Sequence, residues 1–179
     1  MCDEAYMREA LLQAELAGAV GEVPVGAVIV RNGEVIARGY NRPITTDDPT
    51  AHAEIVALRQ AAAVCGNYRL PDCEMYVTLE PCIMCIGAMM HARLKRIVFG
   101  ANDLKTGACG SAVNLVSDTS LNHHAEVVGN VLAEESVAVL QRFFSARRAE
   151  AKARKLREKT LASEEQDMSA LDAGGTESR

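Results

Sequence analysis

The sequence predicts an α/β fold in which helices pack on a mixed β-sheet, and two observations support this class. Two apolar runs, residues 25–30 and 35–40, flank Asn32 and Gly33. Because both of these turn residues tolerate positive φ, the pattern indicates a β-hairpin. Farther along the chain, stretches with helical spacing alternate with short apolar runs. A hairpin followed by alternating helices and strands is typical of a mixed sheet covered by helices.

The other elements follow from apolar spacing and from residues that begin or end helices. An amphipathic helix is predicted over residues 7–17, ending at Gly18. Asp48 or Thr50 is placed to cap the second helix. Pro81 is expected to open the third, because its missing N–H costs nothing there. After the hairpin, helices are predicted over residues 51–64 and 82–93, and strands over 75–79, 97–99 and 126–128.

The C-terminal part changes character along its length. A helix is predicted over residues 133–159, with an apolar face that includes Phe143 and with charge on all sides beyond Arg147. Residues 161–179 are polar and acidic, so a disordered tail is expected there. The sequence therefore predicts a single domain over residues 1–160, followed by that tail.

Composition excludes several classes of protein. The 179 residues are 49% hydrophobic, so the chain can bury a core and is not globally disordered. No apolar run approaches the roughly 20 residues of a membrane helix, and the N-terminus lacks a secretory signal pattern. We therefore expect a cytoplasmic protein. Its six cysteines are then buried thiols or metal ligands rather than disulfides.

The net charge of −5 is a sum of unlike segments. Taken as a whole, it argues against a nucleic-acid partner, which usually meets a basic surface. Residues 142–159, however, hold 8 Lys and Arg against 2 Asp and Glu. A local basic stripe of this kind can attract a phosphate backbone, although such charge runs are often only a solvated helix face.

The sharpest chemical feature is a Cys-x-x-Cys pair, Cys82 and Cys85, directly after Pro81. At a helix start the two sulfurs share one face, and the helix N-terminus favours the thiolate form that zinc binds. Alone, the pair also fits a redox dithiol or two buried cysteines. His52 and Glu54 stand at another predicted helix start, where the simple alternative is a surface or capping pair.

Together these residues predict a metal site. His52, Cys82 and Cys85 supply three ligands, which leaves the fourth position of a catalytic zinc ion to water. Glu54 is then placed to move protons without ligating. A closed structural site is the alternative, with Cys65 or Cys73 as the fourth ligand. Each of these lies about 20 Å away along a helix or a strand, so both fit poorly.

The sequence resembles the zinc-dependent nucleobase deaminases, and within them the bacterial tRNA adenosine deaminases. The signature is His-x-Glu followed by Pro-Cys-x-x-Cys, and the likeness covers about residues 3–155. It implies a cytidine-deaminase-like, three-layer α/β/α sandwich with a mixed five-stranded sheet. The segments that carry it include Glu22-Val-Pro-Val-Gly-Ala-Val28, Asn41-Arg-Pro43, Asp48-Pro-Thr-Ala-His-Ala-Glu54, Thr78-Leu-Glu-Pro-Cys82 and Gly100-Ala-Asn-Asp103.

The resemblance implies a specific reaction. One zinc ion, held by His52, Cys82 and Cys85, activates water for attack on C6 of adenine, while Glu54 transfers protons. The product is inosine at the wobble position of a tRNA anticodon. The family also implies a homodimer with no membrane partner and, as partner, the anticodon stem-loop of a tRNA.

The resemblance also implies five substrate contacts, each with a simpler structural alternative. Asn41 and the backbone at Ala53 contact the target nucleotide, and Asp103 lies against the sugar-phosphate backbone. Phe143 and Arg147 hold flanking nucleotides. From the residues alone, the favoured interpretation is a strand end and turn start for Asn41 and a core residue for Phe143, and Asp103 also fits a turn former.

Two other functions are compatible with the same motifs. A deaminase of a free base or nucleotide keeps the zinc ligands and Glu54 but does not need the basic helix. A non-catalytic, zinc-stabilised RNA-binding module uses the basic helix but does not explain the open coordination position or Glu54.

Overall fold

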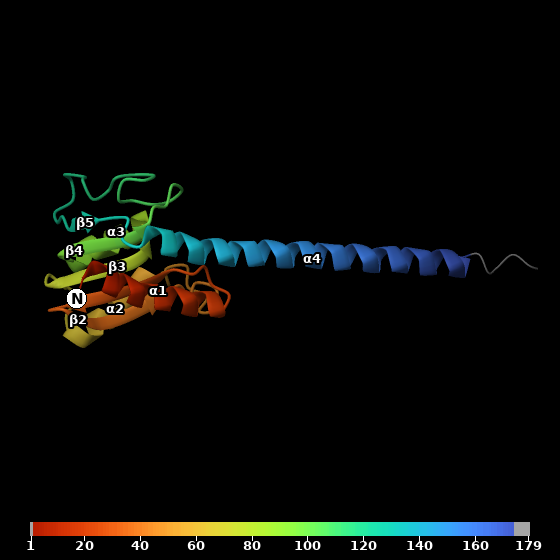
Figure 1. Cartoon of the computed structure of the whole chain (residues 1–179), viewed down its shortest axis with the longest axis horizontal. Helices are drawn as coiled ribbons and strands as arrows, with labels where there is room; N and C mark the ends of the chain where they lie inside the picture. The colour runs from red at the N-terminus through yellow and green to blue at the C-terminus, as the bar shows by residue number, and fades with distance from the viewer. Residues whose placement is uncertain (1, 174–179) are drawn as a thin grey trace, which may run out of the picture. The chain divides into compact units, whose positions relative to one another are not determined.

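The computed structural model describes residues 2–173, with side chains from residue 2 to residue 159. Residues 1–141 form one compact unit and residues 142–179 a second. The first unit holds the sheet and the helices that cover it (Figure 1). The elements in chain order are α1 (Asp3–Ala19), β1 (Gly26–Arg31), β2 (Glu34–Tyr40), α2 (Ala53–Cys65), β3 (Cys73–Leu79), α3 (Ile83–Ala92), β4 (Arg96–Ala101), β5 (Glu126–Val128) and α4 (Ala133–Ala173).

The five strands form one mixed sheet in the order β2-β1-β3-β4-β5. Strand β1 runs antiparallel to both β2 and β3, whereas β3, β4 and β5 run parallel to one another. The β1–β2 hairpin turns at Asn32 and Gly33, whose φ angles are 53° and 81°. Positive φ at both turn positions matches the twist of the flanking strands, and the predicted hairpin is confirmed.

Helices cover both faces of the sheet, which confirms the predicted three-layer α/β/α sandwich. Helices α2 and α3 pack on one face, where the core includes Ile29, Met75 and Ile97. Helix α1 packs on the other face, against Val28 and Tyr76. Neighbouring strand residues therefore point to opposite layers, as the period of a β-strand requires.

Three helix starts differ from the sequence prediction. Helix α1 begins at Asp3 rather than residue 7, and the Asp3 carboxylate accepts a hydrogen bond of 2.7 Å from Arg96 in β4. The N-cap of α2 is His52, so neither Asp48 nor Thr50 caps that helix. Instead, the Asp48 side chain accepts hydrogen bonds from Thr50. Pro81 lies just before the α3 N-cap rather than at its first helical position.

Helix α4 continues to Ala173, beyond its predicted end at residue 159. The disordered tail expected over residues 161–179 stays a prediction, and residues 174–179 lie outside the described part. Residues 161–173 are rich in Ala, Leu, Glu, Gln and Met, which favour helix even where the overall composition is polar. No helix among the described residues is long and apolar enough to cross a bilayer.

Candidate metal centre and active site

Two helices begin at the same edge of the sheet and bring the predicted ligands together. Strands β2 and β3 both run antiparallel to β1, so their carboxyl ends share one edge. The loop after β2 leads to the start of α2, and the loop after β3 leads to the start of α3. Such an edge is where open α/β sheets place their binding sites.

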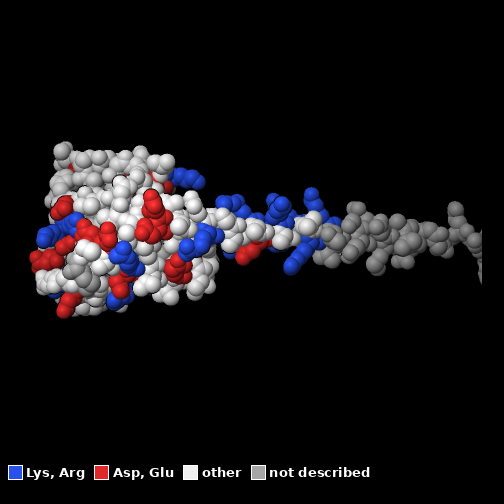
Figure 2. All heavy atoms as spheres, in the orientation of Figure 1, with Lys and Arg blue, Asp and Glu red and all other residues white. Residues whose placement is uncertain are grey.

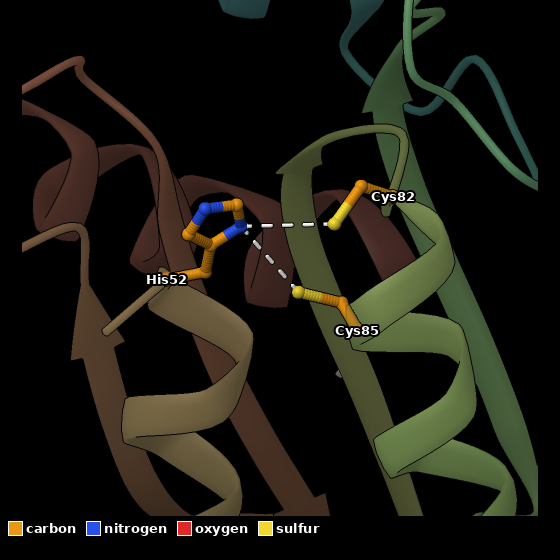
Figure 3. A group of neighbouring side chains, drawn as sticks. All are labelled: His52, Cys82 and Cys85. Atoms are coloured by element: carbon orange, nitrogen blue, oxygen red, sulfur yellow. Dashed lines mark hydrogen bonds between the residues drawn. The ribbon is translucent and has the colours of Figure 1, made fainter. Parts of the chain in front are cut away.

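The side chains of His52, Cys82 and Cys85 point toward one another across this edge (Figure 3). His52 Nδ1 lies 3.8 Å from Cys82 Sγ and 3.6 Å from Cys85 Sγ. Tetrahedral zinc with ordinary Zn–N and Zn–S bonds places such ligand atoms about 3.6 Å apart. The donor set and its spacing therefore fit a zinc ion. Among the residues with described side chains, no fourth His, Cys, Asp or Glu joins this group.

The two cysteines differ in how firmly they hold their protons. A hydrogen bond from Cys85, assisted by one from His52, lowers the pKa of Cys82 to about 4. The same pairing with Cys82, together with burial, raises the pKa of Cys85. Both sulfurs face His52, and a divalent cation bound there would replace the protons of the thiols.

Glu54 lies in the first turn of α2, and only 4% of its surface is exposed. Burial raises the pKa of its carboxyl group, while the nearby His52 charge opposes that shift. Glu54 lines a pocket of about 290 Å³ together with His52 and Cys82. A buried acid that borders the same pocket as the ligands is suited to proton transfer.

Asn41 lines this pocket and is hydrogen-bonded to Ala53 at the start of α2. The Asn41 side-chain oxygen accepts a hydrogen bond of 2.8 Å from the Ala53 amide, and the Asn41 amide group donates to the Val23 carbonyl at 3.1 Å. Asn41 therefore satisfies a free N–H at the start of α2, a task usually given to the N-cap side chain. One further N–H and one lone pair of its amide stay available for a ligand.

Asp103 also lines the pocket and forms the turn that the sequence suggested as its structural alternative. Its carboxylate accepts hydrogen bonds from the Lys105 amide at 2.9 Å and the Thr106 hydroxyl at 2.7 Å. Burial acts to raise the pKa of Asp103, but these hydrogen bonds outweigh it and the pKa is lowered. Asp103 is thus an anion at neutral pH.

Phe143 and Arg147 belong to the second unit and contact each other. The Arg147 guanidinium lies 5.9 Å from the centre of the Phe143 ring, and Phe144 packs edge-on against Phe143 at 5.4 Å. The Phe144 side chain is 43% exposed. Figure 2 shows Lys and Arg side chains along the described part of this helix.

Sequence reasoning missed two buried acids that border the pocket, Glu22 and Glu80. They are 1% and 3% exposed. Glu22 accepts a hydrogen bond from the Thr45 amide at 2.7 Å, and Glu80 accepts three from backbone amides between residues 103 and 111. Both lie in segments that carry the family resemblance, but no role was predicted for either from the sequence.

The family described as the cytidine and deoxycytidylate deaminase zinc-binding region matches residues 1–101. The chain belongs to this zinc-binding deaminase family. A curated relative, the tRNA-specific adenosine deaminase of Haemophilus influenzae, is 52% identical over 89% of this chain and 92% of its own. That of Bacillus subtilis is 46% identical over 84% and 94%.

Solved structures of deaminases also resemble this chain. One, from a study of A-to-I editing by tRNA:A34 deaminases at the wobble position of transfer RNA, superposes with a TM-score of 0.74. It is 44% identical and covers 76% of this chain and 99% of that one. A guanine deaminase from Bacillus subtilis is 43% identical, with a TM-score of 0.55, over 57% of this chain and 66% of that one.

Proposed function

We propose that the chain catalyses hydrolytic deamination of adenosine to inosine at the wobble position of a tRNA anticodon. The observation that carries this proposal is the buried Glu54 beside a three-ligand zinc site, in a chain that resembles tRNA-specific adenosine deaminases over most of its length. A zinc ion at this site supplies a Lewis acid and an activated water.

In the proposed mechanism, the chain's own residues orient the base and move protons. Glu54 accepts a proton from the attacking water at its carboxylate and passes it to the ring nitrogen beside the reacting carbon. It then carries the second proton of that water to the amino group, which leaves as ammonia. Burial raises the pKa of the Glu54 carboxyl group, and the positive charge of a zinc ion beside it would oppose that shift. The pocket of about 290 Å³ is at the lower end of the range for small-molecule sites, so it suits one extruded nucleoside rather than a duplex.

The proposal assigns the RNA contacts as follows. Asn41 uses its remaining N–H and lone pair on the target nucleotide, next to the backbone at Ala53, and Asp103 faces the ribose. Phe143 and Arg147 hold flanking nucleotides of the anticodon stem-loop by stacking and charge. The proposal also includes one domain over residues 1–160 and a cytoplasmic location. It includes a homodimer as well, and light scattering of the purified protein can measure this oligomeric state.

The decisive experiment compares the wild type with Glu54→Gln on a tRNA that carries adenosine at the wobble position. We expect inosine from the wild type and a loss of at least about 10²-fold in rate from the variant, because the proton carrier is gone. Metal analysis should find about one zinc per chain in both proteins, as a three-ligand site requires.

Two controls separate the competing functions. Guanine and cytidine, offered without RNA, should not be converted. Conversion of either, with tRNA left unmodified, would assign the chain to free-base or nucleoside deaminases. Tight tRNA binding without inosine formation by the zinc-loaded wild type would instead favour a non-catalytic RNA-binding module.

A further inference from the structure

A second pair of cysteines lies at the opposite ends of the elements that carry the metal site. Cys65 ends α2, whereas His52 precedes its start, and 13 residues of helix separate the two ends by about 20 Å. Cys73 begins β3, and the chain reaches Cys82 only after that strand. The pair is therefore remote from the proposed zinc centre along both elements.

The two cysteines of this pair share one small pocket. Cys65 and Cys73 both line a cavity of about 190 Å³. Cys73 is buried and Cys65 is half-buried against the same core. Cys65 is therefore the more accessible sulfur of the two that line this pocket.

A cation adjoins the more accessible sulfur. Arg31 pairs with Cys73 across strands β1 and β3, so their side chains emerge on the same face of the sheet. The Arg31 guanidinium donates a hydrogen bond of 3.7 Å to Cys65 Sγ and lies 3.9 Å from the Asp72 carboxylate. Positive charge beside a sulfur supports the negative charge that this sulfur bears as a nucleophile.

We propose that Cys65 and Cys73 form a reversible redox pair, a thiol-modification site that closes to a disulfide on reaction with a low-molecular-weight disulfide. Cys65 attacks the small disulfide, forming a mixed disulfide and releasing one small thiolate. Cys73 then gives its proton to solvent, attacks the Cys65 sulfur and releases the second small thiolate. The cysteine pair loses two electrons and two protons, and the small disulfide becomes two thiols.

Burial supports this order of attack. It raises the pKa of Cys73 to about 11, so that Cys73 stays protonated at neutral pH and serves as the second, resolving sulfur. Closure joins the end of α2 to the start of β3 across a short loop. The ligands Cys82 and Cys85 remain available for zinc, because neither takes part in the exchange.

The test uses the full-length, zinc-loaded protein incubated with oxidised glutathione and then alkylated. Trypsin cuts after Arg69, and a glutamyl endopeptidase cuts after Glu74, so the peptide with Cys73 carries neither Cys82 nor Cys85. We expect a linked pair of peptides that contain Cys65 and Cys73, lighter by two hydrogen atoms than the reduced pair. Dithiothreitol should reverse the link, and the zinc content should stay constant.

Variants sharpen the test. Cys65→Ser and Cys73→Ala should each abolish the linked peptides, whereas Cys2→Ser, which removes an exposed cysteine, should leave them unchanged. Arg31→Met should slow closure by roughly fivefold. A lasting glutathione adduct on Cys65 with free Cys73, or disulfides confined to Cys82 and Cys85, would overturn the proposal. Because the decisive readout is in the wild type, a variant that fails to fold does not weaken the test.

Discussion

At the scale of single residues, Glu80 secures the loop that carries Asp103. Its carboxylate accepts hydrogen bonds from the amides of Asp103 at 3.0 Å, Cys109 at 2.8 Å and Ser111 at 3.1 Å. In Glu80→Gln, one acceptor oxygen is replaced by an NH₂ group, which cannot accept hydrogen bonds from these backbone amides. We expect the free energy of unfolding, measured in urea, to fall by about 2 kcal/mol. Glu34→Gln, at an exposed position in β2, is the matched control and should change it little.

The ionisation of Glu80 should also make the free energy of unfolding depend on pH. Burial acts to raise the pKa of Glu80, but its hydrogen bonds outweigh this and lower the pKa below the unfolded value. The stabilisation from the Glu80 carboxylate is therefore complete above the pKa that this group has in the unfolded chain. It is lost as the pH falls through the lower pKa of the folded state. The difference in unfolding free energy between wild type and Glu80→Gln should therefore shrink below about pH 4.3. A difference that is constant down to pH 2 would contradict this account.

The ligands and the buried acids show how far single residues can be predicted. His52, Cys82 and Cys85 were identified because metal chemistry needs particular residue types at short spacings, which a sequence displays directly. Glu22 and Glu80 were not identified, because their partners lie 23 residues or more away in the chain. Their role depends on loops that meet only after the sheet has formed.

At the scale of elements, a glycine sets how closely α2 approaches the sheet. A Cβ at Gly39 in β2 would overlap the Ala53 carbonyl oxygen and the Ala57 amide nitrogen of α2. Gly39→Ala should displace the helix that positions His52 and Glu54. We expect a loss of about 3 kcal/mol in the free energy of unfolding. Weaker zinc binding, measured with a competing chelator, should accompany it.

A second glycine provides the control for this prediction. Gly87 lies within α3, and a Cβ there would meet nothing within 4 Å. Gly87→Ala should therefore raise the free energy of unfolding by about 0.5–1 kcal/mol, because alanine loses less backbone freedom in a helix. Equal effects at the two glycines would show that packing of α2 against β2 does not limit the site.

At the scale of the whole molecule, the order of elements was predictable but their contacts were only partly so. Hydrophobic spacing and the Asn32-Gly33 turn identified the hairpin and the alternation of helices and strands. The order β2-β1-β3-β4-β5 depends on pairing between strands that are distant in the chain. Helix α4 was predicted too short because a polar, acidic composition was taken as disorder, although its residues individually favour helix.

The uneven charge of the chain leads to the last prediction. Residues 142–159 carry 8 of the 19 Lys and Arg residues, on a helix whose described side chains are mostly exposed. If Lys152, Arg154, Lys155 and Arg157 each contact a phosphate, changing all four to Gln removes four counterion-releasing contacts. The slope of log affinity against log salt for tRNA should then become shallower by about 3 units. Filter binding at salt concentrations from about 50 to about 200 mM measures this slope.

A control variant keeps the helix and its cations and removes two anions instead. Glu150→Gln with Glu158→Gln changes two exposed residues of the same helix but leaves its cations in place. This variant should retain the wild-type slope and bind tRNA at least as tightly. An unchanged slope in the cation variant would show that these four side chains do not contact phosphates. Residues 152–157 would then be a solvated helix face.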